Sequence, residues 1–204
     1  MSQGNPQQAR RNYEKADELI SELVKVSKGP QQLIHMSRQA QVRASLGRYD
    51  EAEAILTKVL EARRGNRNEA QNLPLTLSSL GWVRIQQRKF SEAETVLRES
   101  CDRLDKDGEQ RSNCDSLLGA SLEGQKKFQE AEPLLRSGYD GLLQAPVDER
   151  SIANAAYRVT TSRFSSQDAG AWMAPLYEEW EKPEQAAEWK KKSVQSGQPS
   201  SAVP

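Results

Sequence analysis

The 204-residue sequence is poor in the residue types that usually signal chemistry or membrane insertion. It has one histidine and two cysteines, too few for a histidine-based metal site or a framework of disulfides. No apolar run approaches the roughly 18–20 residues of a membrane-spanning helix, and residues 1–5 lack the regions of a signal peptide. We therefore expect a cytoplasmic protein with no membrane partner.

The chain also lacks a surplus of charge of either sign. It contains 29 basic and 29 acidic residues, so its formal net charge at pH 7 is zero. Because proteins that bind nucleic acid or anionic lipid usually carry a basic surplus, we expect no nucleic-acid partner. A hydrophobic content of 36% with balanced charges is typical of helices whose outer faces are exposed to solvent.

Signatures of catalysis and cofactor binding are missing as well. There is no glycine-rich dinucleotide or phosphate loop and no kinase signature. The single histidine, His35, is predicted on the groove side of a helix near residues 31–46, as a surface or groove residue. We expect no enzyme, no cofactor and no metal.

Pairs of acids recur along the chain and could be mistaken for a catalytic carboxylate pair. We interpret them as solvent-facing charge at helix starts, which the helix macrodipole favours. The pairs are Glu51 and Glu53, Glu92 and Glu94, and Glu130 and Glu132.

A five-residue motif recurs and organises the sequence. Residues 49–53, 90–94 and 128–132 read YDEAE, FSEAE and FQEAE, with looser copies at 13–17 (YEKAD) and 183–187 (PEQAA). The alanine is common to all five, at positions 16, 52, 93, 131 and 186. Self-similarity at such spacings indicates a repeat architecture.

The apolar residues around each motif recur with helical periodicity, and no stretch alternates as a strand does. We predict flexible residues 1–8, a helical-repeat domain over 9–192 and a disordered tail over 193–204. Within the domain we expect a cap helix at 9–28, repeats at about 31–64, 74–104 and 109–143, and an irregular terminal unit at 148–192.

Small residues stand twelve positions before four of the motif alanines, and they suggest how the helices pair. A small residue on each of two antiparallel helices lets their backbones approach closely. We expect these residues at the helix crossings: Ala40, Gly81, Gly119 and Ala174. Leucines four positions after the alanine extend the buried stripe: Leu56, Leu97 and Leu135.

Cys101 and Cys114 flank a predicted turn and are expected to lie near each other. We interpret them as reduced packing residues, since disulfides are rare in the cytoplasm, and a disulfide is the alternative. Trp172, Trp180 and Trp189 are interpreted as packing residues of the last helical pair.

The repeated pattern resembles tetratricopeptide repeats, in particular those of the kinesin-light-chain type. The steps Leu80-Gly81 and Leu118-Gly119 and the motif alanines carry the resemblance, which covers roughly residues 9–192. Similar repeats occur in bacterial proteins, including regions that follow serine/threonine kinase domains. The resemblance implies an all-α fold, a right-handed α-solenoid of stacked antiparallel helix pairs.

The resemblance also implies a concave groove lined by the first helix of each repeat. By residue-by-residue correspondence the groove positions are Ser37, Arg38 and Gln41; Ser78, Ser79, Trp82, Ile85 and Gln86; and Asn113, Ser116, Leu117, Ala120 and Glu123. The basic residues with which one subtype grips a terminal carboxylate are largely absent from these positions. Trp82 is expected either as an exposed anchor for a partner or as packing against the neighbouring repeat.

These observations favour a scaffold that binds a peptide or protein segment in the groove and performs no chemistry. The alternative is a regulatory or oligomerisation segment of a bacterial, kinase-linked signalling system. We expect a monomer or a weak homo-oligomer.

Overall fold

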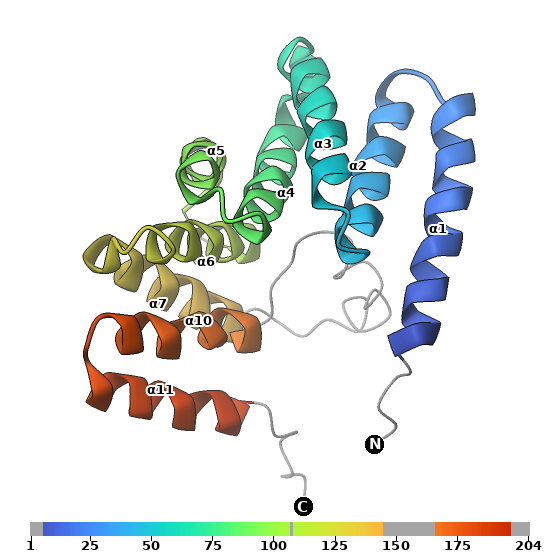
Figure 1. The fold of residues 1–204 in the computed structure, drawn as a ribbon. Coiled ribbons are helices and arrows are strands. Elements are labelled where there is room, and N and C mark those ends of the chain that lie inside the picture. The colour runs from blue at the N-terminus through green and yellow to red at the C-terminus, as the bar shows by residue number, and fades with distance from the viewer. Residues whose placement is uncertain (1–5, 107, 145–165, 197–204) are drawn as a thin grey trace, which may run out of the picture. The chain divides into compact units, whose positions relative to one another are not determined.

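The computed structural model describes residues 6–106, 108–144 and 166–196, and within these ranges the chain forms helices and no strand (Figure 1). The all-α fold predicted from the sequence is confirmed. None of the helices in these ranges is both long and apolar enough to cross a membrane. The contacts divide the described chain into two units, one ending at Lys89 and one beginning at Phe90.

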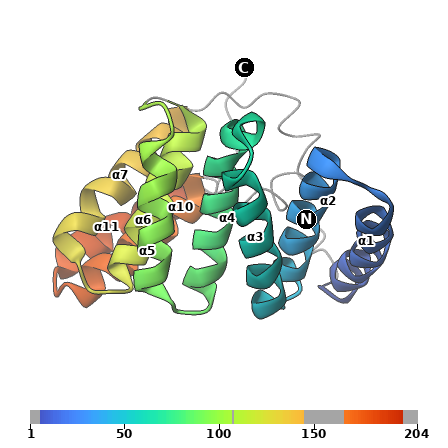
Figure 2. The same ribbon diagram turned by 90° about the horizontal axis from the view of Figure 1, so that it is seen from above.

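The first unit is a row of antiparallel helices that lie side by side in chain order (Figure 2). Helix α1 begins at residue 6, ahead of the expected start at residue 9, because proline suits the first turn of a helix. The elements are α1 (Pro6–Val26), α2 (Gly29–Ser45), α3 (Tyr49–Arg64), the 3-10 helix η1 (Arg67–Asn72) and α4 (Leu73–Gln86).

The second unit is built in the same way. Helix α5 packs on α6, α6 on α7, α7 on α10, and α10 on α11. The elements are α5 (Phe90–Asp102), α6 (Glu109–Glu123), α7 (Phe128–Gln144), α10 (Ser166–Glu179) and α11 (Pro183–Ser196). Residues 145–165 of the expected terminal unit lie outside the described residues, as do residues 197–204 of the expected tail. We keep the division into cap helix, repeats and terminal unit as a proposal.

Within the described residues, the same backbone turn ends four helices and begins the next helix of each pair. Its central residue has a positive φ: Gly47 (77°), Arg88 (61°), Lys126 (61°) and Glu181 (56°). The following N–H reaches back five residues, as from Lys127 to the carbonyl of Leu122 at 2.9 Å. This is the Schellman arrangement, in which a left-handed residue closes the helix. Only one of the four turns has the glycine that this conformation favours.

Replacing Lys126 by glycine should therefore stabilise the protein. Lys126 is exposed, so the change removes little packing, while it relieves a left-handed conformation that costs other residues roughly 1–2 kcal/mol. Greater freedom of the unfolded chain offsets part of this gain. We expect a net increase of about 0.5–1 kcal/mol in the free energy of unfolding, measured by urea denaturation. Lys126→Ala, which keeps the conformational cost, is the control, and an equal effect of both variants would contradict the argument.

The small residues expected at helix crossings are buried, but one of them meets a different partner. Ala52, Ala93 and Ala131 are fully buried. At Gly119 an added Cβ would lie 2.6 Å from Cγ of Leu135 and 3.1 Å from its backbone nitrogen. The close neighbour of Gly119 is thus the leucine one helical turn beyond Ala131. Side chains on a helix point toward its N-terminus, so the Leu135 side chain covers a surface nearer the start of α7 than its own Cα.

Two further glycines, on α7, set the distance between α6 and α7. An added Cβ at Gly138 would lie 2.7 Å from the carbonyl oxygen of Ser112 and 2.9 Å from the nitrogen of Ser116. At Gly141 it would lie 2.9 Å from Cβ of Ser112. The backbones of α6 and α7 therefore approach closely over a stretch that the repeated motif does not mark.

The two cysteines form a disulfide, which corrects the expectation of reduced packing residues. Cys101 of α5 and Cys114 of α6 have Cα atoms 5.7 Å apart, a distance typical of disulfides, and both are buried. Residues on two antiparallel helices at similar distances from the connecting turn face each other. The expectation of reduced cysteines rested on a cytoplasmic location, and location does not determine how far apart two cysteines lie.

Candidate functional site

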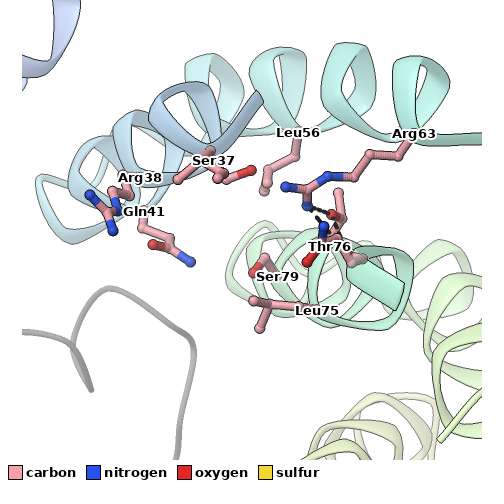
Figure 3. Close-up of a pocket in the computed structure, with 10 residues that line it drawn as sticks. Ser37, Arg38, Gln41, Leu56, Arg63, Leu75, Thr76 and Ser79 are labelled. Atoms are coloured by element: carbon pink, nitrogen blue, oxygen red, sulfur yellow. Dashed lines mark hydrogen bonds between the residues drawn. The ribbon is translucent and has the colours of Figure 1, made fainter. Parts of the chain in front are cut away.

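The strongest candidate site is a pocket in the first unit, between α2 and α4 with α3 behind it (Figure 3). Its volume is about 180 Å³. Four expected groove residues meet there: Ser37, Arg38, Gln41 and Ser79. The other lining residues are Ile34, Leu56, Arg63, Asn72, Leu75 and Thr76, and we call this site the α2–α4 pocket.

Arg63 forms the base of the pocket, and its burial requires neutralisation. The residue is 4% exposed, and its Nε lies 3.3 Å from Oε2 of Glu69, an ionic contact without good hydrogen-bond geometry. Its Nη1 donates to the carbonyl of Asn72 at 3.3 Å and to the hydroxyl of Thr76. Burial lowers the pKa of Arg63, and the attraction of Glu69 opposes that shift. The network ties α3 to η1 and α4.

Gln41 points from α2 into the space between α2 and α4 (Figure 3). The residue is 8% exposed, yet its side-chain amide has no hydrogen-bond partner among the described residues. Neither amide atom of Gln41 is among the buried unpartnered atoms of the described residues, so both are open to the pocket and can bind a ligand there. The amide offers one acceptor and a donor group on the same side chain.

The rim of the pocket is both cationic and apolar. Arg38 is exposed, and within the described residues no acid pairs with it. Ile34 and Leu75 are 36% and 40% exposed, so the rim offers apolar surface beside the cavity. Sequence reasoning missed both because it followed only the groove positions of the resemblance.

Trp82 is not an anchor of this pocket. Its ring lies edge-on to that of Tyr49, with 6.3 Å between the centroids and 78° between the planes. The side chain is half-buried by this contact with the start of α3, and Trp82 does not line the pocket. The contact with Tyr49 agrees with the alternative of packing against the neighbouring repeat, and a role of Trp82 as an anchor elsewhere in the groove stays a prediction.

The remaining expected groove residues do not line the pocket. Ser78, Asn113 and Ser116 are buried, Ile85 and Glu123 are half-buried, Gln86 is exposed, and Leu117 and Ala120 belong to the core. The hydroxyl of Ser116 donates to the carbonyl of Ser112 at 3.0 Å, and the same residue contacts Gly138. Ser116 is thus a packing residue of the α6–α7 pair.

His35 is engaged by its neighbours. Its Nδ1 lies 2.8 Å from Oγ of Ser27, and its Nε2 lies 3.1 Å from the amide nitrogen of Gln31. Ser27 donates its own proton to the carbonyl of Leu23 at 2.5 Å, so Nδ1–H of His35 donates to Ser27. Nε2 then accepts from Gln31. Neither ring nitrogen is left for a substrate.

In three of the motifs, at residues 13–17, 49–53 and 90–94, the second acid joins two neighbouring helix pairs. For these second acids the expectation of solvent-facing charge is wrong. The partner of each is the basic residue directly before the next motif. The ion pairs are Asp17 with Arg48 (3.2 Å), Glu53 with Lys89 (2.7 Å) and Glu94 with Lys127 (2.8 Å). These carboxylate side chains are only 10–17% exposed, whereas Glu51, Glu92 and Glu130 are exposed.

These ion pairs predict a pH dependence of stability. Burial raises the pKa of Glu94, but hydrogen bonds from Lys127, Gln125 and Arg98 outweigh it and lower the pKa from 4.5 to about 2. Because the folded-state pKa is depressed, the stabilisation is present above about pH 4.5 and is lost as the pH falls toward 2.

The measurement is thermal unfolding between pH 2 and 6. Glu94→Gln should lower the melting temperature at pH 6 and flatten its fall below pH 4.5. Glu179→Gln, which changes an exposed acid of the same unit, is the control. Identical pH profiles for both variants would show that Glu94 makes no such contribution.

Antiparallel hairpins with buried small residues, joined by Schellman turns and by repeated ion pairs, define a helical-repeat protein. Residues 31–106 match the family model described as Tetratricopeptide repeat. The resemblance inferred from the motif alanines is confirmed. The kinase-linked bacterial likeness stays an expectation.

The similar proteins share either sequence over part of the chain or fold over most of it. Human "Tetratricopeptide repeat protein 19, mitochondrial" is 33% identical over 96 residues, which cover 47% of this chain and only 24% of that protein. The crystal structure of BtubC (BKLC) from P. vanneervenii aligns with a TM-score of 0.70 at 15% identity, over 97% of this chain and 80% of that one. Kinesin-light-chain TPR-like repeats from Podosopora anserina align with a TM-score of 0.62 at 17% identity, over 93% and 90% of the two chains.

Proposed function

We propose that this chain is a non-enzymatic scaffold that binds an extended segment of a partner protein in the α2–α4 pocket. The observation that carries the proposal is the Gln41 amide, which lines the pocket, is open to it and has no hydrogen-bond partner among the described residues. The exposed Ile34 and Leu75 support it, since apolar side chains beside unsatisfied polar groups are typical of recognition surfaces.

The size of the pocket argues for a segment of protein over a small molecule. Sites for small molecules and cofactors usually enclose roughly 300–1,000 Å³, whereas this pocket encloses about 180 Å³. Among the described residues no group of histidine, cysteine and acidic side chains is arranged to hold a metal ion. A pocket of this size takes one or two side chains of a chain that continues on either side.

Binding of segments from the host proteome, displayed as a peptide array, tests the proposal. Leu75→Asp should abolish binding while the far-ultraviolet circular dichroism stays unchanged. Leu19→Asp, a matched change at an exposed leucine of α1, should bind as the wild type does. Equal binding by both variants would place the site elsewhere in the chain.

The alternative, a regulatory or oligomerisation segment, has one observation in its favour. Helix α1 exposes Leu19, Leu23 and Val26, at 60%, 45% and 76%. Three side chains offer a small contact compared with the roughly 800 Å² per partner of a stable interface. Sedimentation at several concentrations separates the two, since a monomer at all concentrations removes self-association through this face.

A further inference from the structure

The charges that line the α2–α4 pocket are of one sign. The described lining residues include Arg38 and Arg63 and no carboxylate. Glu69, which does not line the pocket, neutralises Arg63, so the charge left for a ligand is that of Arg38. A carboxylate of the ligand that approaches Arg38 would accept a charge-assisted hydrogen bond, which is about twice as strong as a neutral one.

The Gln41 amide is suited to bind the backbone of the ligand. It can accept from one group and donate to another, which matches the N–H and C=O that every residue of a peptide presents. The last residue of a chain presents an N–H and carboxylate oxygens in the same way, so this contact is open to an internal segment and to a chain end alike.

The exposed aliphatic side chains identify the neighbour of the charged group. Ile34 stands one helical turn before Arg38 on α2. Leu75 lines the pocket from α4 (Figure 3). Burial of an aliphatic side chain against them would remove apolar surface from water on both partners. The polar Ser37, Thr76 and Ser79 complete the lining between them.

We propose that the segment bound in the α2–α4 pocket carries an acidic side chain beside an aliphatic one. Arg38 binds the acidic side chain of the segment and Gln41 binds its backbone. Ile34 and Leu75 contact the aliphatic side chain. This inference rests on the proposed function and adds the chemistry of the partner to it.

The test is a parallel selection from a random heptapeptide library embedded in a carrier protein, so that no peptide has a free end. The wild type should enrich Asp or Glu next to Leu, Ile or Val. Arg38→Glu should enrich Lys or Arg at that position and lower the affinity for the wild-type peptides at least tenfold, about 1.4 kcal/mol. Gln41→Leu should weaken binding without changing the charge preference. Arg11→Glu, at an exposed position of α1, should select as the wild type does.

Chemical-shift mapping of a selected peptide separates the two possible failures. Peptides that perturb Ile34 and Leu75 but show no acidic preference, or keep it in Arg38→Glu, would overturn this inference and leave the proposed function intact. Perturbations confined to residues away from the pocket would overturn both.

Discussion

Removing the Cys101–Cys114 disulfide is expected to lower the free energy of unfolding by about 3 kcal/mol. The bond closes a loop with a sequence separation of 13, and a cross-link of about that length removes conformational freedom from the unfolded chain. The Cys101→Ala/Cys114→Ala variant tests this by urea denaturation without reductant. Alanine avoids burying a new polar group at two positions that are 2% and 0% exposed.

The same measurement with a strong reductant is the control. The free energy of unfolding of the reduced wild type should exceed that of the double-alanine variant by much less than that of the oxidised wild type does. Two thiols that react with an alkylating agent in the unfolded, unreduced protein would contradict the disulfide. Alkylation during cell lysis also tests the expected cytoplasmic location, because that compartment keeps most cysteines reduced.

Replacing Gly138 by alanine is expected to destabilise the protein by about 2 kcal/mol. The new Cβ would meet backbone atoms of Ser112 and Ser116 at 2.7 and 2.9 Å, and backbone of a helix cannot move aside as a side chain can. Overpacking of this kind costs roughly 1–3 kcal/mol, and the better helix propensity of alanine returns up to about 1 kcal/mol. Thermal and urea unfolding measure the net effect.

Gly65→Ala is the matched control for this substitution. A Cβ at Gly65 would meet nothing closer than 3.7 Å, and the residue has an ordinary helical φ of −75°. This variant should be as stable as the wild type or slightly more stable. Equal stability of Gly138→Ala would show that α6 and α7 are farther apart than the structure places them.

Most of the fold could be predicted from the sequence because its determinants are local. The apolar period of each segment and the recurring motif identified the helices. Elements such as α3 and α5 begin at the aromatic residue of the motif, Tyr49 and Phe90. The motif alanines are buried because every copy faces a neighbouring helix. The helical period of the apolar residues already indicates this buried face.

The role of the repeated acids was hidden because their partners are distant in the sequence. Lys89 follows Glu53 by a whole helical pair, and only the packing of α4 on α3 brings the two together. Trp82 shows the same limit, since its contact with Tyr49 depends on how two helix ends meet. Position within a repeat predicts a face of a helix but not which neighbour covers it.

The sequence by itself determined the repeated helical hairpin, because helix period, small residues and turns are properties of short segments. The tertiary structure alone decided the pairing of Cys101 with Cys114, the close approach of α6 and α7, and the α2–α4 pocket. Each of these depends on distances between helices, and such distances follow from the packing of many side chains at once. Arg38 and Gln41 were predicted as groove residues, but only packing left their polar groups without partners among the described residues and placed Arg63 and Leu75 beside them.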